Sequence, residues 1–297
     1  MKKITLLIMV ILLSLSLVGC SMLAGGRSDK IVIGGKNFTE QDILVYMMKD
    51  LIEAKTNLKV EVKPYLGGTN VVSQAIERGD LDIYAEYTGT ALINILGEEL
   101  ITDPDKAYEK VREIYKEKKN LVWLKPFGFN NTYTLSMRAD QAKKLGINSI
   151  SDLVSQSPNL ILGATHEFLE RSDGYKGLEK VYGLNFGSTN GMDPGLTYGA
   201  CRDYKVDVID AFSTDGRIQA FNLKTLKDDK RFFPPYYAAP VIRQDTLNKH
   251  PEIAEALNLI AGKLDEEQMA KLNAQVDLEK KDAKDVAHEW LKSQGLI

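Results

Sequence analysis

The chain has 297 residues, of which 44% are hydrophobic and 27% are charged, and its formal net charge is −3. This composition is typical of a folded protein with one large or two medium domains, and it excludes a disordered or fibrous chain. The slight negative charge does not favour nucleic acid as a partner. Two cysteines and three histidines exclude a disulfide framework and leave little material for a metal centre. We therefore expect no metal site and no cofactor.

The first twenty residues predict a targeting signal. Two lysines precede an apolar stretch over residues 4–17, which is short for the roughly 20 apolar residues that cross a bilayer. Residues 17–20 read LVGC and resemble the bacterial lipobox, in which the cysteine is lipidated and becomes the mature N-terminus. An ordinary signal peptide with an incidental cysteine is the alternative. We expect a lipoprotein signal peptide at residues 1–19, followed by a lipid anchor and tether at residues 20–29. The lipid is expected on Cys20, which holds the protein to the extracytoplasmic face of the cell membrane.

Strands and helices alternate in the first half of the remaining chain. Apolar and β-branched residues predict strands at residues 30–34, 58–62 and 81–87. Helices are expected between them, one with Thr39 as its N-cap and one that begins at residues 67–70. This alternation predicts a parallel, doubly wound sheet.

The pattern restarts in the second half. Strands are predicted at residues 160–163 and 206–210, with helices at residues 176–182 and 194–204 between them, and residues 251–291 are expected to be helical. Two α/β units and a helical return predict an α/β fold of two lobes with a ligand cleft between them. We expect the two lobes to comprise residues 30–136 with 241–297, and residues 137–240.

No motif in the sequence predicts an enzyme. The chain has no GxSxG elbow, no P-loop and no GxGxxG loop. Residues 166–170 read HEFLE and superficially resemble the zinc motif HExxH, but Glu170 stands where the second histidine is needed. We interpret His166 as a polar residue at the exit of a strand. An enzyme built on this fold stays as a remote alternative that requires an acid/base or nucleophile set in the cleft.

Four segments combine the end of a strand with aromatic and polar residues. They are residues 34–41, 86–90, 130–133 and 232–237. Ligands of open α/β sheets bind at the carboxyl ends of strands, so these segments are the candidate site. Two cations, Lys36 and Arg171, also follow predicted strands.

These segments carry a family resemblance. In chain order after the lipobox, GGKNFTEQ, GGTNVV, AEYTGT, HEFLERSDG and STDGRI resemble the osmoprotectant-binding lipoproteins of ABC transporters. The resemblance covers essentially the whole mature chain. It implies a type II periplasmic-binding-protein fold, a quaternary amine such as glycine betaine, carnitine or choline as ligand, the permease of an ABC importer as partner, and a monomer.

The resemblance also implies an aromatic cage for the ammonium group. Its positions in this chain are Tyr87, Tyr133, Phe212 and Tyr236. Tyr237 is an alternative to Tyr236, because the doubled tyrosine leaves the register open by one residue. Phe212 stands where the family usually has tyrosine.

The chemistry of such a ligand agrees with this assignment. A trimethylammonium group has no N–H to donate, so it is held by aromatic faces, each worth about 0.5–1 kcal/mol when exposed and about 2 when desolvated. A ligand carboxylate suits Arg171 and Lys36. Thr90, Gln41 and Asn131 are expected to add neutral hydrogen bonds.

Other interpretations of the same residues stay open. Tyr87 and Tyr133 are also ordinary strand residues, and Phe212 also fits a core position. Arg171 is equally consistent with an ion pair beside Glu170 or Asp173, and Lys36 with a solvated side chain. Residues 67–69 either cradle an anion or shape the wall of the cleft. The runner-up function is a receptor for an amino acid or another anion, held mainly by Arg171.

Overall fold

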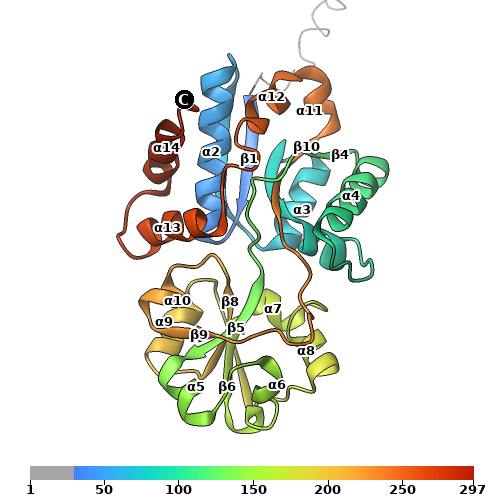
Figure 1. Ribbon diagram of the computed structural model, residues 1–297. Helices are drawn as coiled ribbons and strands as arrows, with labels where there is room; N and C mark the ends of the chain where they lie inside the picture. Colours follow the sequence, from blue (N-terminus) through green and yellow to red (C-terminus); the bar gives the residue numbers. More distant parts are fainter. Residues whose placement is uncertain (1–29) are drawn as a thin grey trace, which may run out of the picture. The chain divides into compact units, whose positions relative to one another are not determined.

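Two five-stranded sheets organise the chain, one in each lobe (Figure 1). The computed structural model describes residues 30–297, and the expected signal peptide, Cys20 and the tether lie outside these residues. The first sheet has the order β2-β1-β3-β10-β4 and the second the order β7-β6-β8-β5-β9. The two-lobed α/β fold is confirmed.

The strands of the first sheet are β1 (Lys30–Lys36), β2 (Lys59–Gly67), β3 (Ile83–Tyr87), β4 (Leu121–Trp123) and β10 (Ala238–Arg243). Those of the second sheet are β5 (Tyr133–Arg138), β6 (Ile161–Thr165), β7 (Ser188–Met192), β8 (Val208–Phe212) and β9 (Leu223–Thr225). The strands predicted from apolar runs are all present.

Both sheets are mixed, so the expectation of purely parallel sheets is wrong. β1 pairs with β3 in parallel, but β10 runs antiparallel to both β3 and β4. In the second sheet β6 is parallel to β7 and β8, while β5 is antiparallel to β8 and β9. The reversed strands are those that enter each sheet from the other lobe. They arrive without the helical crossover that a parallel pair requires.

Two connecting segments join the lobes side by side. The backbone N–H of Asn131 donates to the carbonyl oxygen of Tyr236 at 3.0 Å, and Asn130 pairs with Tyr237 in an antiparallel bridge. The expected lobe boundaries at 136/137 and 240/241 fall inside β5 and β10. Because each strand belongs to a single sheet, we propose crossings just before Tyr133 and Ala238.

Helices cover the first sheet. They are α2 (Thr39–Lys55), α3 (Thr69–Arg78), α4 (Pro104–Ile114), α11 (Gln244–Lys249), α12 (Glu252–Asn258), α13 (Glu266–Asp277) and α14 (Ala283–Ser293). A fully buried set of apolar residues on α2, including Leu44 and Met48, packs in the main core, and α14 lies beside α2 (Figure 1). The C-terminal part of the chain therefore returns to the first lobe, as expected.

The start of α2 differs from the prediction. Phe38, not Thr39, is the N-cap residue, and its side chain makes no capping hydrogen bond. The hydroxyl of Thr39 instead donates to Asp277 Oδ1 of α13 at 2.6 Å. The hydroxyl is thus used to tie α2 to the C-terminal helices.

Shorter helices cover the second sheet. They are α5 (Ala139–Leu145), α6 (Ile150–Leu153), α7 (His166–Glu170), α8 (Tyr175–Tyr182), α9 (Leu196–Arg202) and α10 (Arg217–Ala220). The thiol of Cys201 on α9 is fully buried, and burial raises its pKa to about 11. Cys201 is therefore an apolar packing residue and not a nucleophile, as the sequence indicated.

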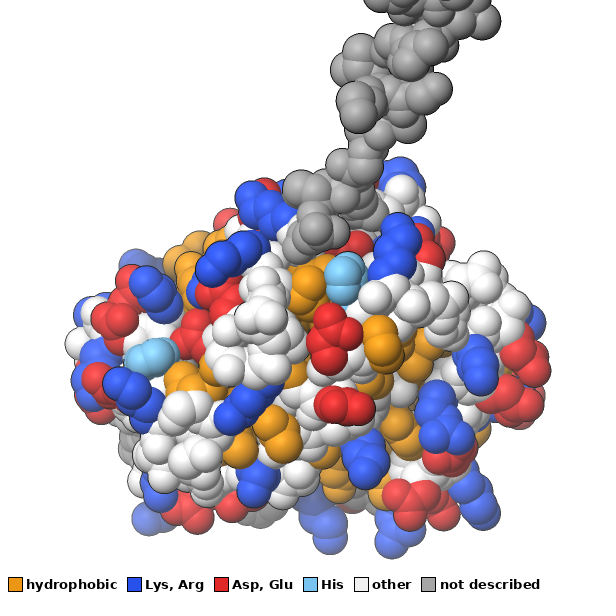
Figure 2. Space-filling model, turned by 90° about the horizontal axis from the view of Figure 1, so that it is seen from above, with side chains coloured by type: hydrophobic (Ala, Val, Ile, Leu, Met, Phe, Trp, Pro, Cys, Tyr) orange, Lys and Arg blue, Asp and Glu red, His pale blue; other side chains and the backbone are white. Residues whose placement is uncertain are grey.

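The surface carries intermixed charges. On the face that Figure 2 shows, Lys and Arg side chains alternate with Asp and Glu side chains, without an extended patch of one sign. Among residues 30–297, no helix is both long and apolar enough to cross a bilayer.

Candidate functional site

A cavity of about 170 Å³ lies between the lobes, where strands of both sheets end. The last residues of β1, β3, β6 and β8 line it, namely Lys36, Tyr87, Thr165 and Phe212. Parallel strands present their carboxyl ends at one edge of a sheet, and both sheets turn that edge toward the cavity. The expected cleft is therefore present at the expected strand ends.

Five aromatic rings form a continuous arc along the cavity wall, which we call the aromatic arc. The centroid separations are 5.7 Å between Tyr236 and Tyr133, and 5.1 Å between Tyr133 and Phe212. Phe212 lies 5.2 Å from Phe38, which lies 6.2 Å from Tyr87. All five residues line the cavity. The structure thus brings the four expected cage residues together and adds Phe38.

The structure places Tyr236, and not Tyr237, at the cavity. The Tyr236 hydroxyl donates to Asp173 Oδ2 at 2.8 Å, which fixes the ring from its far end. The ring of Phe212 packs against the main core and also lines the cavity, and its part in a cage stays a prediction.

Tyr87 is oriented by two neighbours from the start of α2. Its hydroxyl donates to Glu40 Oε1 at 2.7 Å and accepts from Gln41 Nε2 at 3.1 Å. Burial raises the pKa of Tyr87 well above its usual value, so the ring stays neutral. Gln41 is fully buried and is not among the residues that line the cavity. Its Nε2 also donates to the carbonyl oxygen of Ala85 at 3.1 Å, and the expected hydrogen bond between Gln41 and the ligand stays a prediction.

Glu40 connects the aromatic arc with both lobes. Besides Tyr87, its carboxylate accepts from Asn131 Nδ2 at 2.9 Å, Thr214 Oγ1 at 2.6 Å and Asn273 Nδ2 at 3.2 Å. Burial raises its pKa, and these four donors oppose that rise only in part. Since Thr214 belongs to the second lobe, Glu40 also holds the lobes together.

Arg171 lines the cavity but is already paired. Its Nε and Nη2 donate to the two oxygens of Asp173 at 2.7 and 2.6 Å, and its Nη1 donates to Glu167 Oε1 at 2.8 Å. Nη2 also donates to Thr90 Oγ1 of the first lobe at 3.2 Å. Asp173 was one of the two expected ion-pair partners, whereas Glu170 pairs with Lys176 instead. The guanidinium is 3% exposed, so this is a buried network and not a surface pair.

Lys36 is likewise buried and paired. Its Nζ donates to Glu86 Oε1 at 2.6 Å and to Thr69 Oγ1 at 3.0 Å, and it lies 5.3 Å from the Tyr87 ring centroid. The interpretation of Lys36 as a solvated residue is therefore wrong.

The neutral candidates Thr90 and Asn131 both line the cavity. Thr90 is held by Arg171, and Asn131 by its bond to Glu40. The Oδ1 atom of Asn131 is buried without a hydrogen-bond partner.

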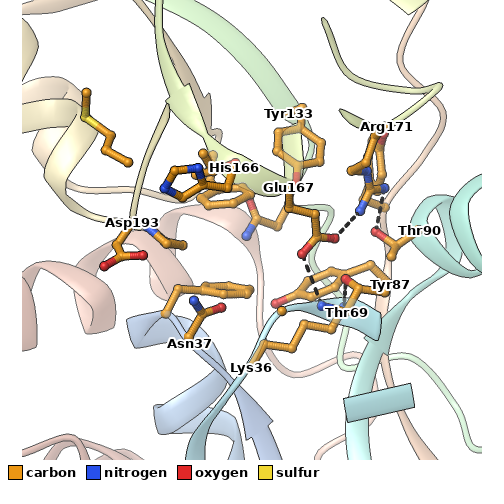
Figure 3. A pocket seen from close by; sticks show the side chains of 18 residues that line it. Lys36, Asn37, Thr69, Tyr87, Thr90, Tyr133, His166, Glu167, Arg171 and Asp193 are labelled. Carbon is orange, nitrogen blue, oxygen red and sulfur yellow. Dashed lines mark hydrogen bonds and ion pairs between the residues drawn. The ribbon is translucent and has the colours of Figure 1, made fainter. Parts of the chain in front are cut away.

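Sequence reasoning missed several lining residues. Phe38 lies in the GGKNFTEQ segment of the candidate site, but the predicted cage included only the aromatic residues that the family resemblance implied. Glu167 stands one helical turn before Arg171, a spacing that favours an ion pair. His166 and Asp193 lie across the cavity from Arg171 (Figure 3). Asp193 follows β7, a strand that the sequence did not predict, so it carried no sequence signal.

Within residues 30–297, no cluster of three or more His, Cys, Asp or Glu side chains is arranged to hold a metal ion.

Comparison with known proteins gives a consistent result. The chain is 43% identical over 300 residues to the carnitine transport binding protein OpuCC of Listeria monocytogenes, covering 99% of this chain and 97% of the relative. It is 39% identical to the ergothioneine transport permease/ergothioneine binding protein EgtU of Helicobacter pylori, covering 90% of this chain and 48% of that longer protein. A crystal structure described as a glycine betaine/carnitine/choline ABC transporter matches with a TM-score of 0.73 and 37% identity, covering 90% of this chain and 99% of that one.

The family match is equally extensive. Residues 29–293 match the OpuAC family, which is described as the substrate binding domain of the ABC-type glycine betaine transport system. The lobes, the cavity at the strand ends and the similarity to OpuCC over 97% of its length agree with it. The chain therefore belongs to the OpuAC family of substrate-binding domains of ABC transport systems.

Proposed function

We propose that the protein captures a small quaternary-ammonium compound, with glycine betaine, carnitine and choline as candidates, and delivers it to the permease of an ABC importer. The observation that carries this proposal is the aromatic arc. Five rings from both lobes and from a connecting segment meet at one cavity. Aromatic faces attract a cation that has no hydrogen to donate, by about 2 kcal/mol or more per ring when water is excluded.

The polar end of the ligand points toward Arg171, Lys36 and Thr90 in this proposal. These residues lie at one side of the cavity (Figure 3). A carboxylate receives charge-assisted hydrogen bonds there. Affinity in the micromolar range requires about −8 kcal/mol, so a ligand this small needs both ends engaged.

Contacts between the lobes support capture by closure. Arg171 of the second lobe bonds to Thr90 of the first at 3.2 Å, and Arg217 of the second lies 3.3 Å from Asp277 of the first. Residues at the cavity thus take part in holding the lobes together. Closure over the ligand shields the ammonium from water and presents one surface to the permease.

A larger betaine is a second candidate. His166 and Asp193 line the side of the cavity opposite Arg171, where a compound as short as glycine betaine does not need them (Figure 3). Ergothioneine, which is named for one relative, is a betaine that carries a ring with further hydrogen-bonding groups. If ergothioneine bound with higher affinity than glycine betaine, this candidate would be favoured.

We also propose that the protein is a monomer held to the extracytoplasmic face of the membrane by lipid on Cys20. The LVGC sequence at residues 17–20 supports this part. Metabolic labelling with a fatty-acid analogue should mark the protein, and Cys20→Ser should abolish the label and release the protein from the membrane.

Calorimetric titration tests the proposed ligand. Glycine betaine, choline, carnitine, ergothioneine and a set of amino acids are titrated in parallel into the purified protein. Binding of a quaternary amine that weakens in Tyr87→Ala and Tyr133→Ala supports the proposal. Binding of an amino acid that is indifferent to both substitutions supports the anion receptor instead.

A further inference from the structure

The segment that follows Phe212 packs against helices of the other lobe. It comprises residues 213–217, which read STDGR and which the aromatic arc leaves unexplained. We call it the STDGR segment. Strand β8 of the second sheet leads into it, whereas α2 and α13, which it contacts, lie beside the first sheet. Its residues are not among those that line the ligand cavity.

Thr214 is held by two groups of the first lobe. Its hydroxyl donates to Glu40 Oε2 of α2 at 2.6 Å, and its carbonyl oxygen accepts from Asn273 Nδ2 of α13 at 3.0 Å. The same Asn273 nitrogen also donates to Glu40 Oε2 at 3.2 Å. None of the three residues is more than 4% exposed. A buried polar group that loses its partner is costly, so these three residues are expected to engage and separate together.

An ion pair lies one turn further along α13. Arg217 Nη2 is 3.3 Å from Asp277 Oδ2, and the hydroxyl of Thr39 donates to the other oxygen of Asp277 at 2.6 Å. The guanidinium is oriented by Asp215, whose two oxygens accept from its Nε at 2.9 Å and its Nη2 at 2.5 Å. Asn273 and Asp277 are four residues apart and therefore share one face of α13. That face meets the STDGR segment at two polar contacts.

The contact between the lobes leaves no room for a side chain at Gly216. A methyl group there would lie 2.7 Å from Ala274 Cβ and 3.2 Å from the carbonyl oxygen of Ala270, both on α13. The backbone of Gly216 has φ −62° and ψ −19°, a right-handed conformation that any residue adopts. The close approach of α13 from the other lobe, and not the conformation of the segment, therefore accounts for glycine at this position.

We propose that the STDGR segment is a latch that holds the lobes closed over the ligand from outside the ligand cavity. The inference rests on the proposed function, in which closure retains the ligand, and it assigns that step to residues other than those of the aromatic arc. The affinity for any ligand includes the fraction of the protein that can close. The latch therefore strengthens the binding of all ligands by the same factor, while the cavity sets the preference among them.

Gly216→Ala tests the latch, because the added methyl group obstructs the closed form while every side chain that lines the cavity stays as it is. We expect calorimetric titration to show about tenfold weaker binding of both glycine betaine and choline, with the ratio of their affinities within about twofold of its original value. The matched control is Gly199→Ala in α9 of the same lobe, where a methyl group meets open space. This control should bind both compounds like the unaltered protein.

Thr214→Val provides a second test, which decides the matter if Gly216→Ala fails to fold. It removes the hydroxyl that donates to Glu40 and should weaken both ligands by a similar factor, whereas Thr214→Ser keeps the hydroxyl and should restore most of the affinity. Weakening of one ligand alone would show that the segment acts on ligand contacts and not on closure. Full affinity in Gly216→Ala or Thr214→Val would overturn the latch alone. If the unaltered protein bound neither compound, the proposed function would fail and the latch with it.

Discussion

The two sides of the cavity use their residues differently. Along the aromatic arc, Tyr133 and Phe212 line the cavity with their ring centroids 5.1 Å apart. On the charged side, Arg171 and Lys36 have internal carboxylate partners. A ring needs no counter-ion to be buried, whereas an unpaired buried cation is costly. A ligand therefore meets the aromatic arc directly but must compete for the cations.

This difference implies that substitutions on the two sides have different first effects. On the aromatic side, loss of a ring removes ligand affinity. On the charged side, loss of a cation first removes stability, because it leaves an internal carboxylate unpaired.

The largest effect is expected for Arg171→Ala. The substitution leaves Asp173, which is 3% exposed, without its cation, and the free energy of unfolding should fall by about 3–5 kcal/mol. Chemical denaturation measures the change. The control is Arg202→Ala, because Arg202 pairs with Asp203 in an exposed position and its loss should change stability far less. An equal effect of the two substitutions would remove the distinction between the charged side and the surface.

Asp210 is a buried carboxyl that accepts hydrogen bonds from neutral donors, so it tests how burial of a carboxylate makes stability depend on pH. It accepts from the Thr165 N–H at 3.0 Å and the Thr165 hydroxyl at 2.8 Å, and burial raises its pKa from 3.8 to about 7. The folded protein thus binds this proton more tightly than the unfolded chain does. Its contribution to stability is complete below pH about 4 and is lost as the pH rises to about 7.

Asp210→Asn should remove this pH dependence. At pH 7 the variant should be more stable than the unaltered protein by about 4 kcal/mol, and near pH 4 the two should be nearly equal. The denaturation midpoints of the variant and the unaltered protein, compared at pH 4 and at pH 7, measure this difference. Parallel pH profiles would show that Asp210 ionises in the folded protein without cost.

On the aromatic side, Tyr133→Ala should weaken the binding of every quaternary amine by about 2 kcal/mol, or roughly thirtyfold. Tyr133 contacts Phe212, Phe168 and Tyr236, so it connects the arc with the core of the second lobe. Tyr133→Phe keeps the ring and should bind nearly as well. Calorimetric affinities that are unchanged in Tyr133→Ala would remove this residue from the cage.

The same comparison explains what could be predicted from the sequence. Strands follow apolar runs such as residues 81–87, and the segments at their ends predicted the position of the cavity, whereas the four cage residues came from the family resemblance. The pairing of Lys36 with Glu86 could not be predicted, since the two residues are 50 positions apart and meet only in the folded sheet. The role of Gln41 behind Tyr87 was hidden for the same reason. Spacing along one helix, as for Glu167 and Arg171, was the one readable signal that was passed over.

The smallest effect is expected for Phe212→Tyr, which tests whether the arc acts through ring faces alone. Phe212 stacks on Phe38 with an interplanar angle of 16° and lines the cavity, and a tyrosine ring at this position would keep the same stacking surface. Phenylalanine and tyrosine present similar faces to a cation, and we expect the choline affinity to change by less than about twofold. A tenfold gain by calorimetry would mean that the missing hydroxyl matters, and that hydrogen bonding supplements the rings even on the aromatic side. A small effect here, beside a large one for Tyr133→Ala, would establish that the arc recognises charge through its ring faces.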